Sequence, residues 1–432
     1  MNRRQFLKAS LASSLLGLNA CANWQIRSQQ KAHVVIIGGG FGGATAARYL
    51  RLYCPEIRIS LIEPKTFYTA CPGSNRVITG LAELASLSFG YQGLNQAYDI
   101  DILPTRVTAI DAVSKRLQLQ TGDHLRYDHL ILAPGIRLRW DTIEGYSEIL
   151  SQQFPHAWQA GPQTLLLRDQ ITALPDNGTV LICPPADPYR CPPGPYERAS
   201  LIAHWLKRHK PRAKILILDP KRSFSKQALF EQAWRQHYAY GTEKALIEWH
   251  SLADNPIQAI DPKSHTVITE FGDKFRGDVI NLIPPQTAGQ IAIETGLTDQ
   301  SGWCPINPVS SQSLLVPGIH VIGDAGHYAP IPKSAFAANS EAKHCALSIR
   351  LMLQDQDPVD PVWFNTCYSA VTDDQAISVS HVYRLDSEHR LSQASIIGGV
   401  SSRTDADSLK QEAVFGQAAY RHLLDDCFAL NI

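Results

Sequence analysis

The stretch from Val180 to Ser200, VLICPPADPYRCPPGPYERAS, raises a chemical question because it resembles a nucleotide-binding βα unit without the glycines. An apolar strand-like run is followed by a turn and a helix-like run. Proline has no N–H to offer a pyrophosphate, and Gly194 is the only nearby glycine, so a phosphate cradle is physically implausible. In place of glycines stand Cys191, a thiol, and Glu197, a carboxylate at a helix start. We therefore expect no nicotinamide at this unit.

An earlier unit, AHVVIIGGGFGGATAARYLRLYCPEIRISLIEP, does carry the glycines. An apolar strand, a glycine turn, an alanine-rich helix and a second strand follow one another. Gly38 is expected to make the tight turn, Gly40 to let the backbone approach a pyrophosphate, and Gly43 to let the helix meet the strand. Glu63 ends the second strand, where an acid can accept both ribose hydroxyls. This unit predicts a bound dinucleotide.

Two later segments favour FAD over NAD. YDHLILAPG, from Tyr127 to Gly135, looks like the strand and turn that return to the dinucleotide in two-dinucleotide flavoproteins. PGIHVIGDA, from Pro317 to Ala325, looks like their second FAD motif. The carboxylate of Asp324, after Gly323, can accept from ribitol hydroxyls or can serve only as a helix cap. The three motifs in this order predict FAD as the cofactor.

The composition is that of a globular protein of two or three domains, with 432 residues, 44% hydrophobic and 19% charged. The 40 basic and 40 acidic residues cancel, so the charge gives no reason to expect nucleic acid or an anionic membrane as a partner. No CxxCH, HExxH or clustered Cys/His ligands occur, so we expect no metal or haem on this chain. Electrons leaving a flavin here need a partner.

The N-terminus, MNRRQFLKASLASSLLGLNACANWQ, predicts a twin-arginine export signal over residues 1–22 and therefore a periplasmic protein. Arg3 and Arg4 precede a short, weakly apolar run that is too short to span a membrane, and no other run reaches the length of a spanning helix. Simple cleavage is favoured over a lipid on Cys21. Disulfides persist in the periplasm, so some of the nine cysteines could be paired.

Several further stretches carry a resemblance that extends over roughly residues 32–430. They are PYRCPPGPYERAS, FSKQALFEQAWRQHYAYGTEKALIEWH, DVINLIPPQTAGQIA, GLTDQSGWCP and NTCYSAV. Together they resemble the flavoprotein subunit of flavocytochrome c sulfide dehydrogenase. Members of that family bind FAD, oxidise sulfide in the periplasm and pass electrons to a c-type cytochrome subunit. The resemblance implies the same cofactor, substrate and partner for this chain.

The resemblance also implies a covalent flavin. The family's thioether to the flavin 8α-methyl falls on Cys71, in EPKTFYTACPGSNRVITG, and such a bond raises the flavin potential, which suits sulfide as a donor. Pro72 and Gly73 depart from the family's usual surroundings and alter the loop. Tight non-covalent FAD and an ordinary buried cysteine remain the alternatives.

The family's redox-active disulfide falls on Cys191 and Cys367. A bridge closing so long a loop could also be a structural staple, and the residues alone do not decide between the two. Glu197 is the family's candidate base, although a carboxylate at a helix start can be only a dipole partner. Lys333 follows the second FAD motif and could stabilise reduced flavin near its pyrimidine ring, or could be a surface lysine.

The predicted activity is therefore oxidation of sulfide to zero-valent sulfur or polysulfide through this disulfide, with electrons passing through FAD to the cytochrome. A sulfide:quinone oxidoreductase is the nearest alternative enzyme. It would need a membrane-docking C-terminus, and the tail SLKQEAVFGQAAYRHLLDDCFALNI is only mildly amphipathic. A non-catalytic flavin-bearing subunit of a periplasmic complex is an alternative from another class.

The predicted fold class is α/β, with two Rossmann-like doubly wound domains and a C-terminal α+β interface domain. The FAD-binding domain is expected in two pieces, 32–150 and 276–355. A degenerate NAD-type domain is inserted over 151–275. The C-terminal interface domain, 356–432, is expected to fold back over the flavin, because it carries Cys367.

Overall fold

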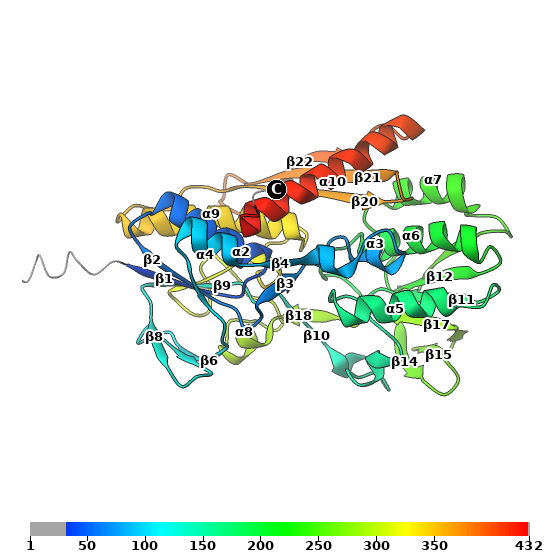
Figure 1. The fold of residues 1–432 in the computed structure, drawn as a ribbon, viewed down its shortest axis with the longest axis horizontal. Coiled ribbons are helices and arrows are strands. Elements are labelled where there is room, and N and C mark those ends of the chain that lie inside the picture. The colour runs from blue at the N-terminus through cyan, green and yellow to red at the C-terminus, as the bar shows by residue number, and fades with distance from the viewer. Residues whose placement is uncertain (1–31, 431–432) are drawn as a thin grey trace, which may run out of the picture.

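The computed structural model describes residues 32–430, and its frame is two parallel β-sheets that lie side by side along the long axis of the molecule (Figure 1). The export signal expected over 1–22, with Cys21, lies outside the described residues. The predicted α/β fold class is confirmed. Within 32–430, no helix is long and apolar enough to cross a membrane.

The first sheet consists of β1 (His33–Ile37), β2 (Arg58–Ile62), β5 (Asp101–Leu103), β9 (His129–Leu132) and β19 (Ile319–Val321), and helices α2 (Phe41–Tyr53) and α9 (Ala335–Leu353) cover one face. Its strand order is β19-β9-β1-β2-β5, with every neighbouring pair parallel. Side chains of β1 alternate between two cores: Val34 faces the helices and Val35 faces the opposite side. Because both faces are buried, β1 reads as a continuous apolar run.

The second sheet consists of β11 (Thr179–Cys183), β12 (Lys214–Asp219), β13 (Ile247–Ser251) and β17 (Val279–Leu282), with helices α5 (Pro162–Ala173), α6 (Gly194–His209) and α7 (Gln227–Tyr238). Its order is β13-β12-β11-β17, again all parallel. Val180 packs into the core with α6 and α7, whereas Leu181 packs into the core on the other face. The second unit thus repeats the βα frame of the first.

In each of the two domains, a three-stranded antiparallel ribbon comes immediately before one strand of the parallel sheet in the sequence. That strand is β9 in the first domain and β17 in the second. The ribbons are β6 (Val107–Asp111), β7 (Arg116–Leu119) and β8 (His124–Arg126), and β14 (Ile257–Asp261), β15 (Thr266–Thr269) and β16 (Lys274–Arg276). The antiparallel pair β10 (Ile136–Leu138) and β18 (Gln286–Ala288) marks where the chain leaves the first domain and comes back. Shorter elements are β3 (Phe67–Thr69), α3 (Ser74–Ile78), β4 (Ser88–Gly90), α4 (Gln92–Tyr98) and α8 (Gln290–Glu294).

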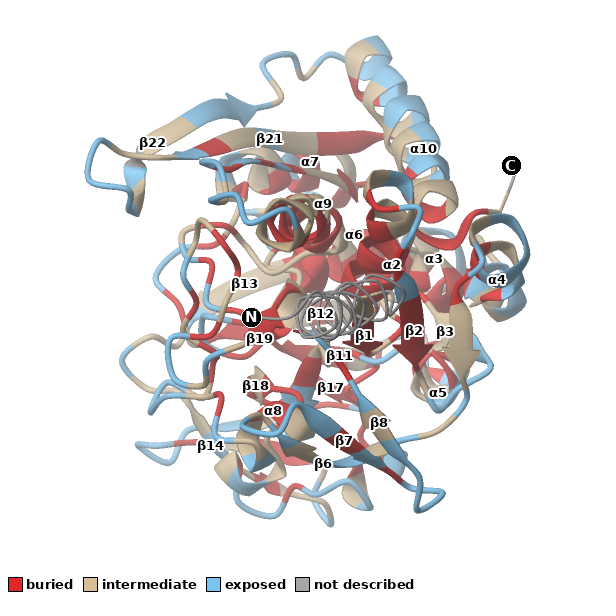
Figure 2. Cartoon of the chain, turned by 90° about the vertical axis from the view of Figure 1, so that its left-hand side faces the viewer, coloured by how far each residue is buried: buried red, intermediate tan, exposed pale blue. Residues whose placement is uncertain are grey.

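The C-terminal domain is an antiparallel sheet of β20 (Val362–Ala370), β21 (Ala376–Leu385) and β22 (Leu391–Val400), followed by helix α10 (Ala406–Phe428). The helix runs back to the first domain, where the Phe428 ring packs 5.5 Å from that of Tyr68 and 5.9 Å from that of Phe41. Figure 2 shows that much of β22 and α10 faces solvent. This domain places β20 against both parallel-sheet domains.

The expected boundary at residue 275 divides the chain differently from the sheets. Strand β17 falls in the predicted second piece of the FAD domain, but it pairs with β11 in the second sheet. The chain therefore returns to the first domain only after β17. The apolar run VINLIPP has the same pattern as the returning strand of the first domain, so the sequence did not show to which sheet it belongs.

Candidate functional site

A cavity of about 740 Å³ lies where the two parallel-sheet domains meet the C-terminal domain. The turns after β1, β9 and β19 line it from the first domain. The loop 190–194 and the start of α6 line it from the second, and β20 and α10 line it from the third. Its size is within the range of cofactor pockets, and the carboxyl ends of parallel strands are where open α/β sheets bind ligands.

The glycine turn after β1 is forced by backbone packing. Gly38 has φ +100°, and a Cβ there would lie 2.3 Å from the carbonyl oxygen of Ala133. A Cβ on Gly43 would lie 1.8 Å from the carbonyl oxygen of Gly38. Both obstacles are main-chain atoms that cannot turn aside. Gly40 lines the cavity, and the approach of a pyrophosphate to its backbone stays a prediction.

Glu63 follows β2 and lines the same cavity. One carboxylate oxygen accepts the N–H of Gly39 at 2.9 Å, and the other accepts the N–H of Lys65 at 3.0 Å. These two hydrogen bonds hold the carboxylate at the end of the strand. Each carboxylate oxygen keeps acceptor capacity for a further donor. Its contact with ribose hydroxyls stays a prediction.

The second flavin motif lines the cavity just after the end of β19. Asp324 lines the cavity, and burial raises the pKa of its carboxyl. Gly323 has φ +70°, and its N–H donates to Glu341 of α9 at 2.8 Å. The first turn of α9 also lines the cavity, so the positive end of that helix faces it. Gly135, with φ +65°, lines it from the turn after β9.

These residues fit a dinucleotide flavin. The glycine turn leaves no room for side chains, an acid ends β2, and the N-terminal ends of α2 and α9 both face the cavity. Such an arrangement suits a pyrophosphate at one helix and an electron-rich ring at the other. Within 32–430, no cluster of three or more His, Cys, Asp or Glu side chains could hold a metal ion.

Cys71 lines the cavity and is partly exposed to it. Its thiol lies 3.7 Å from the carbonyl oxygen of Trp158, a weak contact. The loop that carries it is tied to α10, because the hydroxyl of Tyr420 donates to the carbonyl of Pro72 at 2.8 Å. The thiol is thus open to a cofactor in the cavity, and its covalent attachment stays a prediction.

Cys191 and Cys367, which are far apart in the sequence, line one cavity. Cys191 lies in the loop before α6 with φ +58°, and its N–H donates to the carbonyl of Lys333 at 2.8 Å. Cys367 lies in the middle of β20. Burial raises the pKa of the Cys191 thiol, and the charges of Cys367 and Glu197 raise it further. The two sulfurs are not joined in the structure, so the disulfide stays a prediction.

Glu197 lies in the first turn of α6 and lines the cavity with the two cysteines. Burial raises the pKa of its carboxyl to about 7, against the opposing effect of Lys226, Arg76 and Arg198. A carboxyl that titrates near neutral pH is suited to taking up and releasing a proton. Its position is also that of a helix-dipole partner, so the geometry allows both roles.

The structure does not bring the Lys333 ammonium to the cavity. It donates to the carbonyls of Asp324 at 2.7 Å and Gly326 at 2.8 Å and lies 3.8 Å from the ring centroid of Trp303. Lys333 is absent from the described cavity lining. The carbonyl groups of the turn and the aromatic ring draw the ammonium inward, so the expectation of a contact with the flavin pyrimidine needs correction.

Two buried cations near the cysteines were missed in the sequence. Arg198 donates to the side-chain oxygens of Asn75 at 3.0 Å and Asn281 at 2.7 Å, and so holds α6 against the first and second domains. Lys226, just before α7, donates to the backbone oxygen of Cys367 at 3.0 Å. Neither belongs to a recognisable motif. Only the fold shows that these side chains reach the site.

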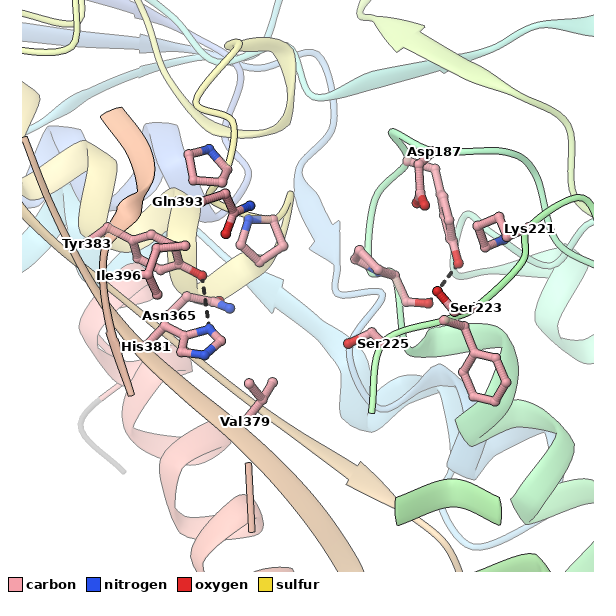
Figure 3. A pocket seen from close by; sticks show the side chains of 15 residues that line it. Asp187, Lys221, Ser223, Ser225, Asn365, Val379, His381, Tyr383, Gln393 and Ile396 are labelled. Atoms are coloured by element: carbon pink, nitrogen blue, oxygen red, sulfur yellow. Dashed lines mark hydrogen bonds between the residues drawn. The ribbon is translucent and has the colours of Figure 1, made fainter. Parts of the chain in front are cut away.

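A smaller cavity of about 470 Å³ lies at the carboxyl ends of β11 and β12. Figure 3 shows Asp187, Lys221 and Ser225 on one wall and His381 and Tyr383 on the other. The Lys221 ammonium is engaged, because it lies 2.6 Å from Asp219 and donates to the carbonyl of Pro185 at 2.9 Å. The C-terminal sheet therefore forms one wall of the cavity at the carboxyl end of the second sheet.

Three protein families match consecutive parts of the chain. Residues 32–160 match the pyridine nucleotide-disulphide oxidoreductases. Residues 164–284 match the family described as sulfide dehydrogenase (flavocytochrome c) flavoprotein chain, central. Residues 359–428 match the flavin-binding family of flavocytochrome c sulphide dehydrogenase. The flavin that the three motifs predict is supported by these matches.

Sulfide:quinone oxidoreductases match the chain over different lengths. The sulfide-quinone reductase of Aquifex aeolicus is 29% identical over 116 residues, which span only 27% of its own length and 27% of this chain. The mitochondrial sulfide:quinone oxidoreductase of Mus musculus is 21% identical over 343 residues, covering 76% of this chain and 72% of that protein. The solved sulfide:quinone oxidoreductase of Aquifex aeolicus has a TM-score of 0.71 at 18% identity, with 92% of both chains covered, and shows the shared fold.

A shorter relative is much more similar. The sulfide dehydrogenase (flavocytochrome c) flavoprotein chain of Chlorobaculum thiosulfatiphilum is 57% identical over 44 residues, which are 10% of this chain and 92% of that relative. The predicted resemblance is confirmed by this match and by the two domain families above. The chain belongs to the flavoprotein-chain family of flavocytochrome c sulfide dehydrogenase, a family of oxidoreductases.

Proposed function

We propose that this chain oxidises sulfide to zero-valent sulfur or polysulfide at a disulfide between Cys191 and Cys367, and that the electrons pass through FAD to a c-type cytochrome subunit. The observation that carries the proposal is the convergence of three groups. Cys191, Cys367 and Glu197 come from a loop, a strand and a helix, and they line the same cavity as the glycine turn. A structural staple alone would not need a neighbouring acid or an open cavity.

The chain's own residues account for the chemistry of sulfur. Hydrosulfide attacks one sulfur of the disulfide, a new S–S bond forms, and the other cysteine leaves as a thiolate. Glu197 takes the proton of the incoming sulfide or of the persulfide, because its pKa of about 7 lets it exchange protons near neutrality. Bound FAD supplies an acceptor that can take an electron pair and release single electrons.

Cys71 is the residue that we propose forms a thioether to the flavin. It lies on the cavity wall with its thiol weakly held, and Tyr420 fixes the neighbouring backbone. A covalent bond would keep the cofactor in place during export and raise its potential. The test is to denature the purified holoprotein and look for yellow colour retained on the chain; colour released from wild type would contradict the bond.

The C-terminal sheet offers a surface for the cytochrome. Phe364 of β20, Val382 of β21 and Ile397 of β22 form a cross-strand row, and the two outer side chains are 49% and 62% exposed. Phe415 of α10 is 58% exposed. Strand β20 also carries Cys367, so a partner on this sheet would lie close to the redox site. Exposed aromatic and aliphatic side chains of this kind are typical of interfaces.

The periplasmic location rests on the twin-arginine pattern of Arg3 and Arg4. Cleavage near residue 22 would release the chain into the periplasm, whereas a lipid on Cys21 would anchor it. Fractionation of cells that make the full chain tests this. The mature protein should appear in the periplasmic fraction, and replacing both arginines by lysine should retain it in the cytoplasm. Periplasmic yield that the double substitution does not change would contradict twin-arginine export.

A sulfide:quinone oxidoreductase is the second candidate, since relatives with that name share the fold and match over most of the chain. Such an enzyme would hand its electrons to a membrane quinone. The experiment adds decylubiquinone or cytochrome c to sulfide-reduced holoprotein under anaerobic conditions. We expect rapid oxidation by the native cytochrome subunit and slow oxidation by the quinone. The reverse order would favour the quinone enzyme, and no bleaching by sulfide would favour a non-catalytic subunit.

A further inference from the structure

Lys226 is a buried lysine whose ammonium is directed at one cysteine of the pair. It immediately precedes α7 with φ +62° and is 8% exposed. Its Nζ donates to the hydroxyl of Ser369 at 2.8 Å and to the carbonyl of Cys367 at 3.0 Å, and lies 4.0 Å from the Sγ of Cys367. It is absent from the described lining of the large cavity. Lys226 therefore approaches Cys367 from outside the cavity and does not line the space that a substrate would occupy.

The surroundings of Cys191 are different. No hydrogen-bond donor among residues 32–430 reaches its sulfur, and Glu197 brings a negative charge to the same wall. Burial and that charge raise the pKa of the Cys191 thiol. An anion is stabilised by an opposite charge within a few ångströms and destabilised by a like charge or by burial. The two sulfurs are therefore unequal as sites for a negative charge.

We propose that Lys226 stabilises the thiolate of Cys367 and so directs hydrosulfide to the sulfur of Cys191. The inference rests on the proposed function and specifies its first step. The sulfur of hydrosulfide forms a bond to Sγ of Cys191. The Cys191–Cys367 bond breaks, and its electron pair goes to Sγ of Cys367. The products are a persulfide on Cys191 and a thiolate on Cys367, so charge and atoms balance, and the negative charge moves from hydrosulfide to the sulfur beside Lys226.

The leaving group decides the direction of such an exchange. In thiol–disulfide exchange, attack occurs more readily at the sulfur whose partner leaves as the more stable thiolate. The ammonium of Lys226 makes Cys367 the more stable leaving thiolate, and attack is therefore directed to the sulfur of Cys191. Glu197 acts on the Cys191 thiol and also accepts a hydrogen bond from the backbone of Ala370 at the end of β20, and it can take the persulfide proton. Arg76 and Arg198 act on Glu197. Arg190 and Lys226 act on Cys191, against the larger effects of burial, Cys367 and Glu197.

The direct test is to locate the persulfide in wild-type holoenzyme. The oxidised enzyme is mixed with one equivalent of sulfide without cytochrome, quenched rapidly with iodoacetamide, digested and analysed by mass spectrometry. We expect the extra sulfur on the peptide that contains Cys191 and a simple alkylated thiol on the peptide that contains Cys367. An extra sulfur on Cys367 in the earliest quenched samples would overturn the proposal.

The role of Lys226 is tested with the Lys226→Gln variant, which keeps a hydrogen-bond donor and loses the charge. We expect iodoacetamide to label Cys367 of the reduced holoenzyme at pH 7 about 10-fold more slowly or worse, because a charge within ~4–6 Å changes a thiol–thiolate equilibrium by about one to three powers of ten. Lys226→Arg, which keeps the charge, should stay within about 3-fold of wild type. Equal rates in wild type and Lys226→Gln would overturn the proposal.

Ser369→Ala is the matched control for a merely structural role. It removes one acceptor of Lys226 and leaves the charge in place. We expect labelling within about 2-fold of wild type, and a fall equal to that of Lys226→Gln would show that strand position, not charge, sets the reactivity. Failure of the proposed function is distinct, because sulfide would then not bleach the wild-type flavin. If it bleaches and the extra sulfur is on Cys367, only the direction of attack is wrong.

Discussion

The two turns that connect a strand to a helix at the centres of the parallel sheets have the same frame and opposite chemistry. After β1, residues 38–40 turn sharply and α2 begins at Phe41. After β11, residues 184–193 form a longer loop and α6 begins at Gly194. In the second loop the N–H of Gly194 donates to the carbonyl of Cys191 at 2.9 Å, and the N–H of Tyr196 donates to the carbonyl of Pro193 at 3.2 Å. The loop itself thus uses N–H groups that a phosphate would need.

The comparison shows that the backbone, and not the order of strands and helices, decides what such a unit can hold. The first turn presents glycines and helix N–H groups to a cofactor. The second replaces them by prolines and uses the added length to bring Cys191 and Glu197 to the first unit's cavity. In the proposed function, one unit holds the flavin and the other supplies Cys191 and Glu197 for the sulfur chemistry.

The largest expected effect comes from replacing Cys367, the cysteine that the C-terminal domain contributes to the proposed disulfide. Cys367→Ser should lower sulfide-dependent cytochrome c reduction by about 10³-fold or more, because no disulfide can form, while flavin stays bound. Activity is measured with purified complex and flavin by absorbance. Cys54→Ala, a buried cysteine of the first core, is the control and should keep turnover. Retained turnover in Cys367→Ser would remove the disulfide from the mechanism.

Glu197→Gln should give the next largest effect. We expect a loss of about 10²-fold in sulfide oxidation, typical of a missing general base. The wild-type rate, corrected for the fraction of sulfide present as hydrosulfide at each pH, should rise around pH 7, where Glu197 loses its proton. The corrected rate of the variant should lack this rise. A pH–rate profile of flavin reduction checks both. An unchanged profile would leave Glu197 as a dipole partner of α6.

The same residue makes a prediction about stability. Because its pKa is raised from 4.5 to about 7 in the folded protein, the folded state keeps this proton longer than the unfolded chain does. The contribution of Glu197 to the free energy of unfolding should therefore fall as pH rises from about 4.5 to 7 and stay constant above. Denaturant titrations should show that fall in wild type and not in Glu197→Gln.

A matched pair of glycine substitutions compares the two turns directly. A Cβ on Gly43 meets the Gly38 carbonyl at 1.8 Å, so Gly43→Ala should deform the first turn and lower the flavin content about 10-fold. A Cβ on Gly194 meets the Trp158 ring at 2.7 Å and the Cys191 sulfur at 3.1 Å. Gly194→Ala should keep the flavin and lower turnover by less than about 10-fold. Flavin loss in Gly194→Ala alone would reverse the two roles.

The smallest effect on activity is expected for Lys333→Met. Its ammonium serves the carbonyls of Asp324 and Gly326 and not the cavity, so sulfide-dependent turnover should change by less than about 3-fold. Two buried acceptors lose their donor, which costs about 1–3 kcal/mol in the free energy of unfolding. Turnover and denaturant midpoint are measured on the same preparation. A large loss of turnover at unchanged stability would place the lysine at the flavin after all.

The sequence was most informative where backbone constraints leave few options. Gly38 and Gly43 could be assigned because any side chain collides with main-chain atoms, and the prolines of the second loop exclude a phosphate cradle for the same local reason. The fold class followed from the two βα patterns. The cysteine positions came from the family resemblance, and spacing alone could not have paired a loop with a distant strand.

The rest depended on contacts between distant segments. Lys226 reaches Cys367 only because the segment just before α7 lies against β20. Lys333 turns away from the cavity only because Trp303 and two carbonyls bind its ammonium. Strand β17 joined the second sheet by pairing with β11, although its sequence resembles β9. Such choices are made by tertiary packing, which residue patterns along the chain do not encode locally.

The most direct test of the central claim is an anaerobic titration of the native holoprotein with sulfide and, separately, with NADH. The flavin absorbance near its visible maximum reports reduction, and added cytochrome subunit reports electron release. We predict that about one equivalent of sulfide begins to bleach the flavin and that cytochrome restores it, while excess NADH leaves it yellow. Bleaching by NADH, or a flavin that sulfide does not reduce, would contradict the account.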